Sequence, residues 1–320
     1  MKRVFILILL ITFNFFAQTV QNTDSTKNKS YTYSSYSKEQ NGVEKGTIKG
    51  PFEFHSKIIP NTVRLYWVYI PANYDYNSPA NLLVFNDGQR AINPKGALRI
   101  PTVLDNLIFN KKIPQTIGLF VTPGNLSEHY PEDLGMSNPN NRLEEYDVLD
   151  DNYSRLLIEE LLPEIEKNYH ISTDSRKRII GGTSSGAIAA FTVTWHHPEA
   201  FGNVISLIGS YTSIGYLPAT DDDKIRLGGD SYPTLIRKSA IKPIRIFLQD
   251  GSNDLDNEHG NWFLSNQQML AAFQWANTNA DKLNINTTRY DIKYNWGTDG
   301  HSDTHGGVLL PEIITWLWRD

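Results

Sequence analysis

The stretch RIIGGTSSGAIAAFTVTWHH, residues 178–197, decides the expected fold. Arg178, Ile179 and Ile180 close a short β-branched run, two glycines interrupt it, and an alanine-rich helix former begins at Gly186. The stretch therefore predicts a strand, a tight turn and a helix.

The turn itself reads GTSSG, residues 182–186, which matches the pattern G-x-S-x-G. Such a turn holds its central serine in a strained conformation on a sharp bend, with the hydroxyl clear of the sheet. Ser184 is the candidate nucleophile, because a nucleophile at Ser185 would require glycines at Thr183 and Ala187. The alternative is an ordinary turn serine without a chemical role.

The composition excludes several classes of protein. The 320 residues are 40% hydrophobic and 20% charged, which suffices to bury one large α/β core. A net charge of −5 gives no electrostatic footprint for nucleic acid or for an anionic membrane, so we expect neither as a partner. The sequence contains no cysteine, which excludes disulfides and thiol chemistry.

The N-terminus has the features of an export signal. Lys2 and Arg3 precede an apolar run over residues 4–16, and Ala17 offers a cleavage site. The run is too short to span a bilayer but has the length of a signal-peptide core. We therefore predict a signal peptide over residues 1–17, a secreted or periplasmic protein and no membrane span in the mature chain; an N-terminal anchor is the alternative.

The rest of the chain divides into a polar segment and one large domain. Residues 18–45 are rich in Thr, Ser, Asn and Lys and are expected to form a flexible tether. Alternation over residues 46–71 suggests three antiparallel strands at one sheet edge. From residue 81 onward, buried strands alternate with helices, which predicts a mostly parallel, doubly wound sheet flanked by helices in a single domain, 46–320.

Individual elements can be placed along this domain. The expected parallel strands are 81–86, 115–122, 178–180, 204–208, 244–248 and 289–294, and the helices include 153–169, 267–276 and 309–318. Pro163 is expected to kink or break the helix 153–169. Residues 123–141 form a long, turn-rich loop that suggests a functional loop or a lid, and residues 210–236 form an irregular insertion.

A serine nucleophile of this type requires an acid and then a base, each beyond a later strand. The acid candidates follow the strand 244–248 and are Asp250, Asp254 and Asp256. We favour Asp254, because Asp250 stands beside a glycine at the strand end, where a turn role suits it better.

The base candidates follow the last strand, in the segment GTDGHSDTHGG. We favour His301, because its glycine-rich loop can bring the imidazole back over the sheet to Ser184. His305 opens the last helix, where a cap or a supporting role is expected, and two ordinary surface histidines are the alternative.

An oxyanion hole needs two backbone N–H donors. The residue after the nucleophile, Ser185, supplies one. Gln89 in the segment NDGQ is the candidate for the other, because Gly88 lets the backbone turn toward the site. An ordinary Asp-Gly turn is the alternative.

Several spaced motifs together resemble the esterase D family of α/β-hydrolases. They are DGQ (87–89), NRLEEY (141–146), a helix ending in P-x-I-x-x-x-Y, RIIGGTSSG, QDGSND (249–254) and GTDGH (297–301). The family includes enterochelin esterases, bacterial feruloyl and acetylxylan esterases, and mycolyltransferases. The resemblance covers residues 60–318, and the DGQ form is more similar to the enterochelin-esterase branch. Ala187 departs from the family, which often has glycine there.

The resemblance implies an α/β-hydrolase fold with Ser184, Asp254 and His301 as the catalytic triad. It implies that Gln89 and Ser185 supply the oxyanion hole.

Two further residues are candidates for substrate binding. Arg142 could clamp a substrate carboxylate or phenolate, or it could form an Arg–Glu pair with Glu145 that braces the long loop. Trp262 could stack on an aromatic acyl group or a sugar ring, or it could pack in the core.

The expected function is that of a secreted serine carboxylic-ester hydrolase working through an acyl-enzyme on small-molecule or carbohydrate-linked esters, without a cofactor. Feruloyl or acetyl esters of polysaccharides are the favoured substrates, and a siderophore trilactone of the enterochelin type is the alternative. Other classes remain open. One is a metal-dependent hydrolase with zinc ligands from the segment His301-x-Asp303-x-His305 and a third ligand from His259 or the Asp254 region. The other is a binding protein without turnover.

Overall fold

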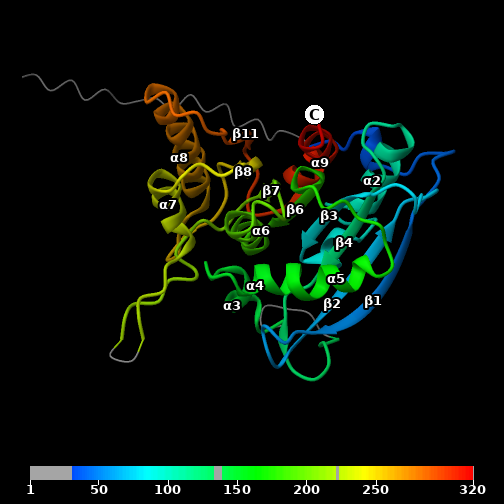
Figure 1. Ribbon diagram of the computed structural model, residues 1–320, viewed down its shortest axis with the longest axis horizontal. Helices are drawn as coiled ribbons and strands as arrows, with labels where there is room; N and C mark the ends of the chain where they lie inside the picture. Colours follow the sequence, from blue (N-terminus) through cyan, green and yellow to red (C-terminus); the bar gives the residue numbers. More distant parts are fainter. Residues whose placement is uncertain (1–30, 133–138, 221–222, 320) are drawn as a thin grey trace, which may run out of the picture.

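Apolar strands that are buried on both faces build the centre of the molecule. The computed structural model describes residues 31–132, 139–220 and 223–319, and there it contains a nine-stranded sheet of order β1-β2-β4-β3-β6-β7-β8-β11, with β5 beside β2 (Figure 1). The six neighbouring strands from β4 to β11 run parallel, and β1 and β2 are antiparallel. This arrangement confirms the predicted mostly parallel sheet of an α/β-hydrolase.

The strands of this sheet are β1 (Thr47–His55), β2 (Thr62–Ile70), β3 (Asn81–Asn86), β4 (Thr116–Val121), β5 (Asn125–Leu126), β6 (Arg178–Thr183), β7 (Asn203–Leu207), β8 (Arg245–Gly251) and β11 (Asp291–Gly297). The helices are α1 (Gly88–Ala91), α2 (Ile100–Phe109), α3 (Arg142–Tyr146), α4 (Asn152–Arg155), α5 (Leu162–Glu166), α6 (Ser185–His196), α7 (Tyr232–Lys238), α8 (Trp262–Lys282) and α9 (Asp303–Leu317). A short two-stranded ribbon, β9 (Asp256–Asn257) and β10 (Gly260–Asn261), precedes α8.

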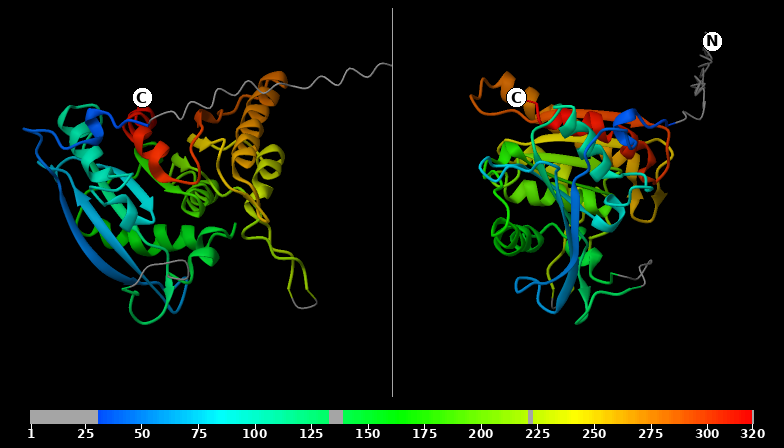
Figure 2. Two further views of the ribbon diagram at one scale, coloured as in Figure 1. Left: turned by 180° about the vertical axis from the view of Figure 1, so that it is seen from behind. Right: turned by 90° about the vertical axis from the view of Figure 1, so that its right-hand side faces the viewer.

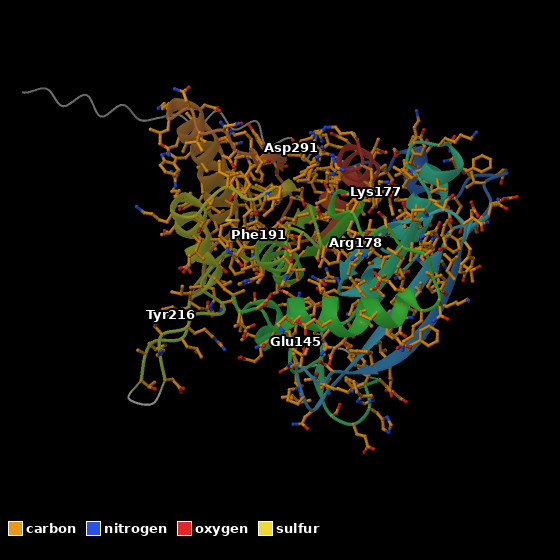
Figure 3. The ribbon with its side chains drawn as sticks, viewed as in Figure 1. Glu145, Lys177, Arg178, Phe191, Tyr216 and Asp291 are labelled. Carbon is orange, nitrogen blue, oxygen red and sulfur yellow. The ribbon has the colours of Figure 1, made fainter. Side chains whose placement is uncertain are left out.

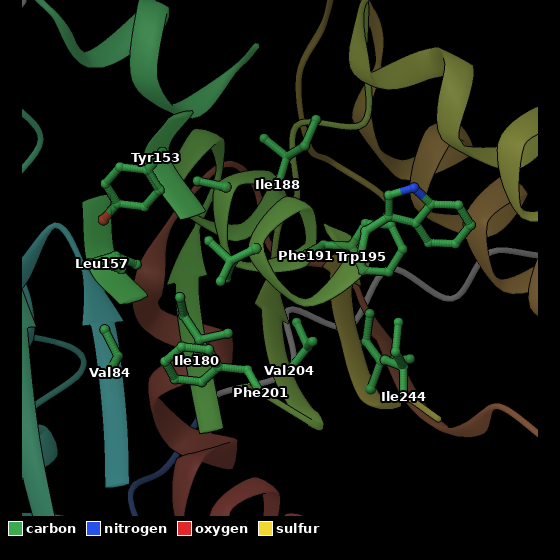
Figure 4. Close-up of a cluster of buried hydrophobic side chains, with 14 of the residues drawn as sticks. Val84, Tyr153, Leu157, Ile180, Ile188, Phe191, Trp195, Phe201, Val204 and Ile244 are labelled. Atoms are coloured by element: carbon green, nitrogen blue, oxygen red, sulfur yellow. The ribbon is translucent and has the colours of Figure 1, made fainter. Parts of the chain in front are cut away.

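Helices cover both faces of the sheet because successive side chains of a strand point to opposite sides. In β3, Leu82 and Val84 pack with the side chains of α4 to α8, whereas Leu83 and Phe85 pack with those of α2 and α9. Figure 2 shows these two helical layers with the sheet between them. Figure 4 shows the larger of the two cores, in which Phe191 of α6 is surrounded by other buried side chains.

The helix predicted over residues 153–169 continues past Pro163, without the expected break, and contains a wider turn just before it. A π-helical segment, Leu156–Leu161, joins α4 to α5, and Pro163 stands in the first turn of α5. A proline lacks an N–H donor and crowds the carbonyl one turn before it. The wider hydrogen-bond spacing of the π-helical segment therefore allows the helix to continue past Pro163.

The antiparallel edge has fewer strands than residues 46–71 suggested. That segment forms two nine-residue strands, β1 and β2, and the extra pairing partner of β2 is β5, which comes from beyond β4. The pairing of β1 with β2 has an irregular register between Lys49 and Phe52. An alternating sequence pattern does not distinguish one long strand with such a bulge from two short strands, which is why three strands were expected.

The expected tether over 18–45 is packed where the structure describes it, from residue 31 onward. Tyr31 stacks on His305 with the ring centroids 4.4 Å apart, and the Tyr33 hydroxyl donates to the carbonyl of Ala97. Asn106 of α2 donates to two backbone carbonyls of this segment. The prediction of a tether was wrong for residues 31–45, because their tyrosines supply apolar surface that the polar composition concealed.

The signal peptide predicted over residues 1–17 lies outside the described residues. Among the helices that are described, none combines the length and the apolar character that a membrane crossing requires.

Candidate active site

Ser184 stands on a sharp bend between β6 and α6. Its backbone has φ of 57° and ψ of −125°, a conformation that a residue with a Cβ rarely adopts. The strand and the helix pass so closely that a Cβ on Gly182 would lie 2.3 Å from the carbonyl carbon of Gly186. Glycine is therefore required at position 182, and β6 runs through both glycines to Thr183 instead of ending before them.

Ser184, His301 and Asp254 form one hydrogen-bonded chain. His301 Nε2 lies 2.9 Å from Ser184 Oγ, and His301 Nδ1 lies 2.6 Å from Asp254 Oδ1. The Asp254 side chain has no exposed surface, while that of His301 is 23% exposed. An ionised carboxylate only accepts hydrogen bonds, so Nδ1 carries the proton and Nε2 is free to accept the serine proton.

Two loops carry the acid and the base, and they are tied to each other. Asn253 Nδ2 donates to the carbonyl of Thr298 at 2.7 Å. A Cβ on Gly251 would lie 2.1 Å from the carbonyl oxygen of Asp299, so the loop after β8 needs glycine to approach the loop after β11. Since β8 and β11 are parallel neighbours, both loops leave the same edge of the sheet.

Asp250, the last residue but one of β8, is a fully buried carboxyl beside Asp254. Its two oxygens accept hydrogen bonds from the Gly251 backbone and the Asn266 amide, each at 2.7 Å. Burial, together with the hydrogen bond to Asp254, raises the pKa of Asp250 to about 9. Burial acts in the same direction on Asp254, but hydrogen bonds from His301 and Asp250 hold the pKa of Asp254 below its usual value. Asp250 is thus a neutral acid that donates to the ionised Asp254.

Ser210 lies beside the nucleophile, in the segment that the sequence showed only as an irregular insertion. Its Oγ is 3.0 Å from Ser184 Oγ and accepts a hydrogen bond of 3.0 Å from Trp262 Nε1. Trp262 is only 2% exposed and its ring meets that of His301 edge to face, with centroids 5.7 Å apart. Of the two roles expected for Trp262, the structure supports core packing rather than an open stacking surface.

The two expected oxyanion donors lie at the ends of neighbouring strands. Ser185 is the first residue of α6 and Gln89 is the second residue of α1, so neither N–H has a carbonyl one turn earlier in its own helix. Because β3 and β6 are parallel neighbours, both helices start at the same edge of the sheet. The two loops are in contact, since a Cβ on Gly186 would lie 3.0 Å from Asp87 Oδ2.

Arg142 pairs with Asp87, not with Glu145 as one interpretation of the sequence expected. Its Nε and Nη2 donate to the two carboxylate oxygens of Asp87, at 3.1 and 2.8 Å. The Arg142 side chain remains 30% exposed, and its guanidinium lies over the ring of Tyr146. Glu145 instead pairs with Arg64, a residue that the sequence did not single out.

A second carboxyl near the oxyanion donors, that of Asp147, is also buried. Burial raises the pKa of Asp147 to about 7, although a hydrogen bond with Ser185 and the charge of Arg142 act in the opposite direction. The site therefore contains a carboxyl that changes its charge near neutral pH, next to a proposed oxyanion donor.

The loop that contains Gly215, Tyr216 and Arg226 lies against the Asp147 side of the site. Its base, Gly215, touches Asp147 so closely that a Cβ would lie 1.9 Å from the Asp147 carbonyl oxygen. Arg226 pairs with Glu144 of α3 at 2.6 Å. Figure 3 shows Tyr216 where this loop leaves the body of the protein.

The three residues considered for a zinc site point to different partners. His301 contacts Ser184 and Asp254, Asp303 pairs with Arg90, and His305 Nδ1 lies 2.9 Å from Gln249 Nε2. Among the described residues, no three histidine, cysteine or acidic side chains are grouped as metal ligands. This donor arrangement does not fit a metal held by these three residues.

The sequence assigned no role to four residues of the site and its support, namely Arg64, Asp87, Asp147 and Ser210. Two of them could have been found from their place in the predicted fold. Asp87 and Ser210 follow the carboxyl ends of the parallel strands β3 and β7, where ligands of such sheets bind. Nothing in the local sequence marks Asp147, whose burial depends on distant segments.

The fold and the site together define an α/β-hydrolase with a serine at its nucleophile turn. The chain belongs to the Esterase family, whose model, described as "Putative esterase", matches residues 57–297.

Solved structures of two esterases share the fold. The chain is similar to the enterochelin esterase of Shigella flexneri, with 17% identity, 88% of this chain and 60% of that chain covered, and a TM-score of 0.63. It is also similar to a ferulic acid esterase from Anaeromyces mucronatus, with 18% identity, 89% and 96% covered, and a TM-score of 0.63. The chain thus spans 60% of the length of the enterochelin esterase and nearly all of the ferulic acid esterase.

Proposed function

We propose that the protein hydrolyses carboxylic esters through a covalent acyl-enzyme on Ser184. The observation that carries the proposal is the hydrogen-bonded chain from Ser184 through His301 to Asp254. As Ser184 Oγ attacks the ester carbonyl, its proton passes to His301 Nε2, which then returns the proton to the departing alcohol. Water attacks the acyl group in the second half-reaction, with His301 again as the base, and Ser184 is regenerated.

Asp254 holds His301 in the tautomer that this sequence of proton transfers requires. Its ionised carboxylate accepts a hydrogen bond from the Nδ1–H group and stabilises the imidazolium that forms during each step. Asp250 supports this role, because the hydrogen bond from its neutral carboxyl favours the ionised form of Asp254.

The backbone N–H groups of Ser185 and Gln89 are proposed to stabilise the oxyanion. Both N–H groups lie in the first turn of a helix, where they have no carbonyl partner within that helix, and the dipole of the twelve-residue α6 adds to the Ser185 donor. Their location beside the nucleophile turn supports this assignment.

The mechanism is tested by the kinetics of p-nitrophenyl acetate hydrolysis. We expect a burst of p-nitrophenol equal to the enzyme concentration, and we expect Ser184→Ala to lose both the burst and the turnover while it remains folded. Turnover by the folded Ser184→Ala variant at more than a few per cent of the parent rate would refute the assignment.

For the substrate, we propose ester-linked acyl groups of the feruloyl or acetyl type on polysaccharides. The match over nearly the full length of a ferulic acid esterase supports this class. A siderophore trilactone is the second candidate, favoured by the exposed part of the Arg142 guanidinium, which offers a cationic contact for a phenolate. Release of ferulate from feruloylated arabinoxylan, measured beside hydrolysis of enterobactin, separates the two.

We also propose that the protein is exported, on the basis of the basic and apolar N-terminal residues. N-terminal sequencing of the protein recovered from the periplasm and the medium tests this. A mature chain beginning at Gln18 is expected, and recovery of the intact chain from the cytoplasm alone would contradict it.

A further inference from the structure

We infer that Ser210 is a further catalytic residue, which donates a hydrogen bond to Ser184 Oγ in a direction fixed by Trp262. The inference rests on the proposed serine mechanism and adds a donor to the reacting oxygen itself. It is carried by a chain of two hydrogen-bond contacts, from Trp262 Nε1 to Ser210 Oγ and from Ser210 Oγ to Ser184 Oγ, each 3.0 Å long.

The direction of the hydrogen bonds follows from what each group can do. The indole N–H of Trp262 can only donate, so Ser210 Oγ accepts from it. Ser184 directs its own proton to His301 Nε2, because Nδ1 of that imidazole donates to Asp254. Within the described part of the chain, Ser184 Oγ is the one acceptor paired with the Ser210 hydroxyl, so the Ser210 proton points at it.

Burial and backbone contacts hold this arrangement in place. Ser210 is 1% exposed, so water does not compete for its hydroxyl. Its backbone N–H donates to the carbonyl of Ser184 at 3.2 Å, and Asn266 Nδ2 donates to the carbonyl of Gly209 at 2.9 Å. The donor is therefore preorganised, and no reorganisation is required when charge develops on the nucleophile.

The chemical consequence concerns charge on Ser184 Oγ. When its proton passes to His301 and the bond to the acyl carbon begins to form, the oxygen carries negative charge that the Ser210 hydroxyl stabilises. During deacylation the bond between Oγ and the acyl carbon breaks, Oγ recovers a proton from His301, and the same hydrogen bond stabilises the leaving oxygen. Ser210 keeps its own proton throughout both steps.

The test measures kcat, KM and the rate of serine labelling by a fluorophosphonate in the parent protein and four variants. Ser210→Ala removes the donor, and we expect kcat and the labelling rate to fall by roughly tenfold to a hundredfold with little change in KM. Trp262→Phe keeps a ring but removes the N–H, and we expect a smaller loss of about twofold to tenfold. Because Trp262 acts through Ser210, the double variant should be no slower than Ser210→Ala alone.

Ser213→Ala provides the matched control, because Ser213 lies in the same loop but its hydroxyl donates to the exposed His259 carbonyl. We expect this variant to keep the parent rate, and thermal melting of every variant separates loss of rate from loss of fold. A folded Ser210→Ala protein with the parent rate or a higher one would overturn the inference, as would equal, additive losses in the two single variants. Failure of the underlying mechanism would appear differently, as activity retained by Ser184→Ala.

Discussion

The guanidinium of Arg64 donates two hydrogen bonds to the carboxylate of Glu145, at 2.6 and 3.0 Å, and neither side chain has any exposed surface. Glu145 also accepts from the backbone of Gly124 and from the side chain of Asn141, both at 2.9 Å. Gly124 and Asn141 lie at the two ends of the long loop after β4. The ion pair therefore joins strand β2 to both ends of the loop and to α3, which carries Arg142 into the site.

Removing one member of this pair should be costly, because the other would remain as an uncompensated buried charge. We predict that Arg64→Met lowers the free energy of unfolding by about 3–5 kcal/mol. Arg155→Ala is the control, since Arg155 pairs with Glu159 in solvent and its removal should change the free energy of unfolding far less. Urea unfolding measures both, and equal losses in the two variants would contradict this account of the buried pair.

The backbone strain at Ser184 predicts different free energies of unfolding for two substitutions that both inactivate the protein. Ser184→Gly should raise the free energy of unfolding by about 1 kcal/mol relative to Ser184→Ala, because glycine adopts a φ of 57° without strain. Both variants lose the nucleophile, so activity does not confound the comparison. Thermal melting decides it, and a glycine variant less stable than the alanine variant would show that the turn stores no strain.

The pKa of Asp250 predicts a dependence of stability on pH. With a pKa of about 9, the folded protein keeps a proton that the unfolded chain releases near pH 4. Its contribution to stability is therefore fully present below about pH 4 and is lost progressively as the pH rises toward 9. Asp250→Asn has no such titration, so its free energy of unfolding should fall less between pH 5 and 9.

The same residue has a predicted effect on catalysis. The amide of Asp250→Asn can donate to Asp254 as the neutral acid does, so we expect it to keep kcat within about threefold. Asp250→Leu removes that donor and should lower kcat by about tenfold or more, with a shift in the pH–rate profile. Identical profiles for the two variants would show that Asp250 does not act through Asp254.

Much of the fold could be predicted from the sequence because the parallel strands are continuous apolar runs. The runs around Leu83, Val204 and Phe247 need no distant information to be recognised as buried strands. Boundaries were less accurate: α8 begins five residues before the expected 267, at Trp262, and α9 begins at Asp303 rather than 309, which brings His305 into the helix.

The site was predictable to the extent that its residues are tied to turns with a required chemistry. The glycine pattern at Ser184 and the polar loops after two strands gave the nucleophile and the candidates for acid and base. Arg64, Asp147 and Ser210 were missed, because each obtains its role from a partner far away in the sequence. The packing of Arg64 against Glu145, 81 residues later, has no local signal.

The central claim, that His301 activates Ser184, is tested most directly by locating a fluorophosphonate adduct by mass spectrometry in the parent protein and in His301→Ala. The account predicts stoichiometric labelling at Ser184 in the parent and labelling slower by about a thousandfold or more in the folded variant. An adduct on another residue, or equal labelling rates in the two proteins, would contradict it.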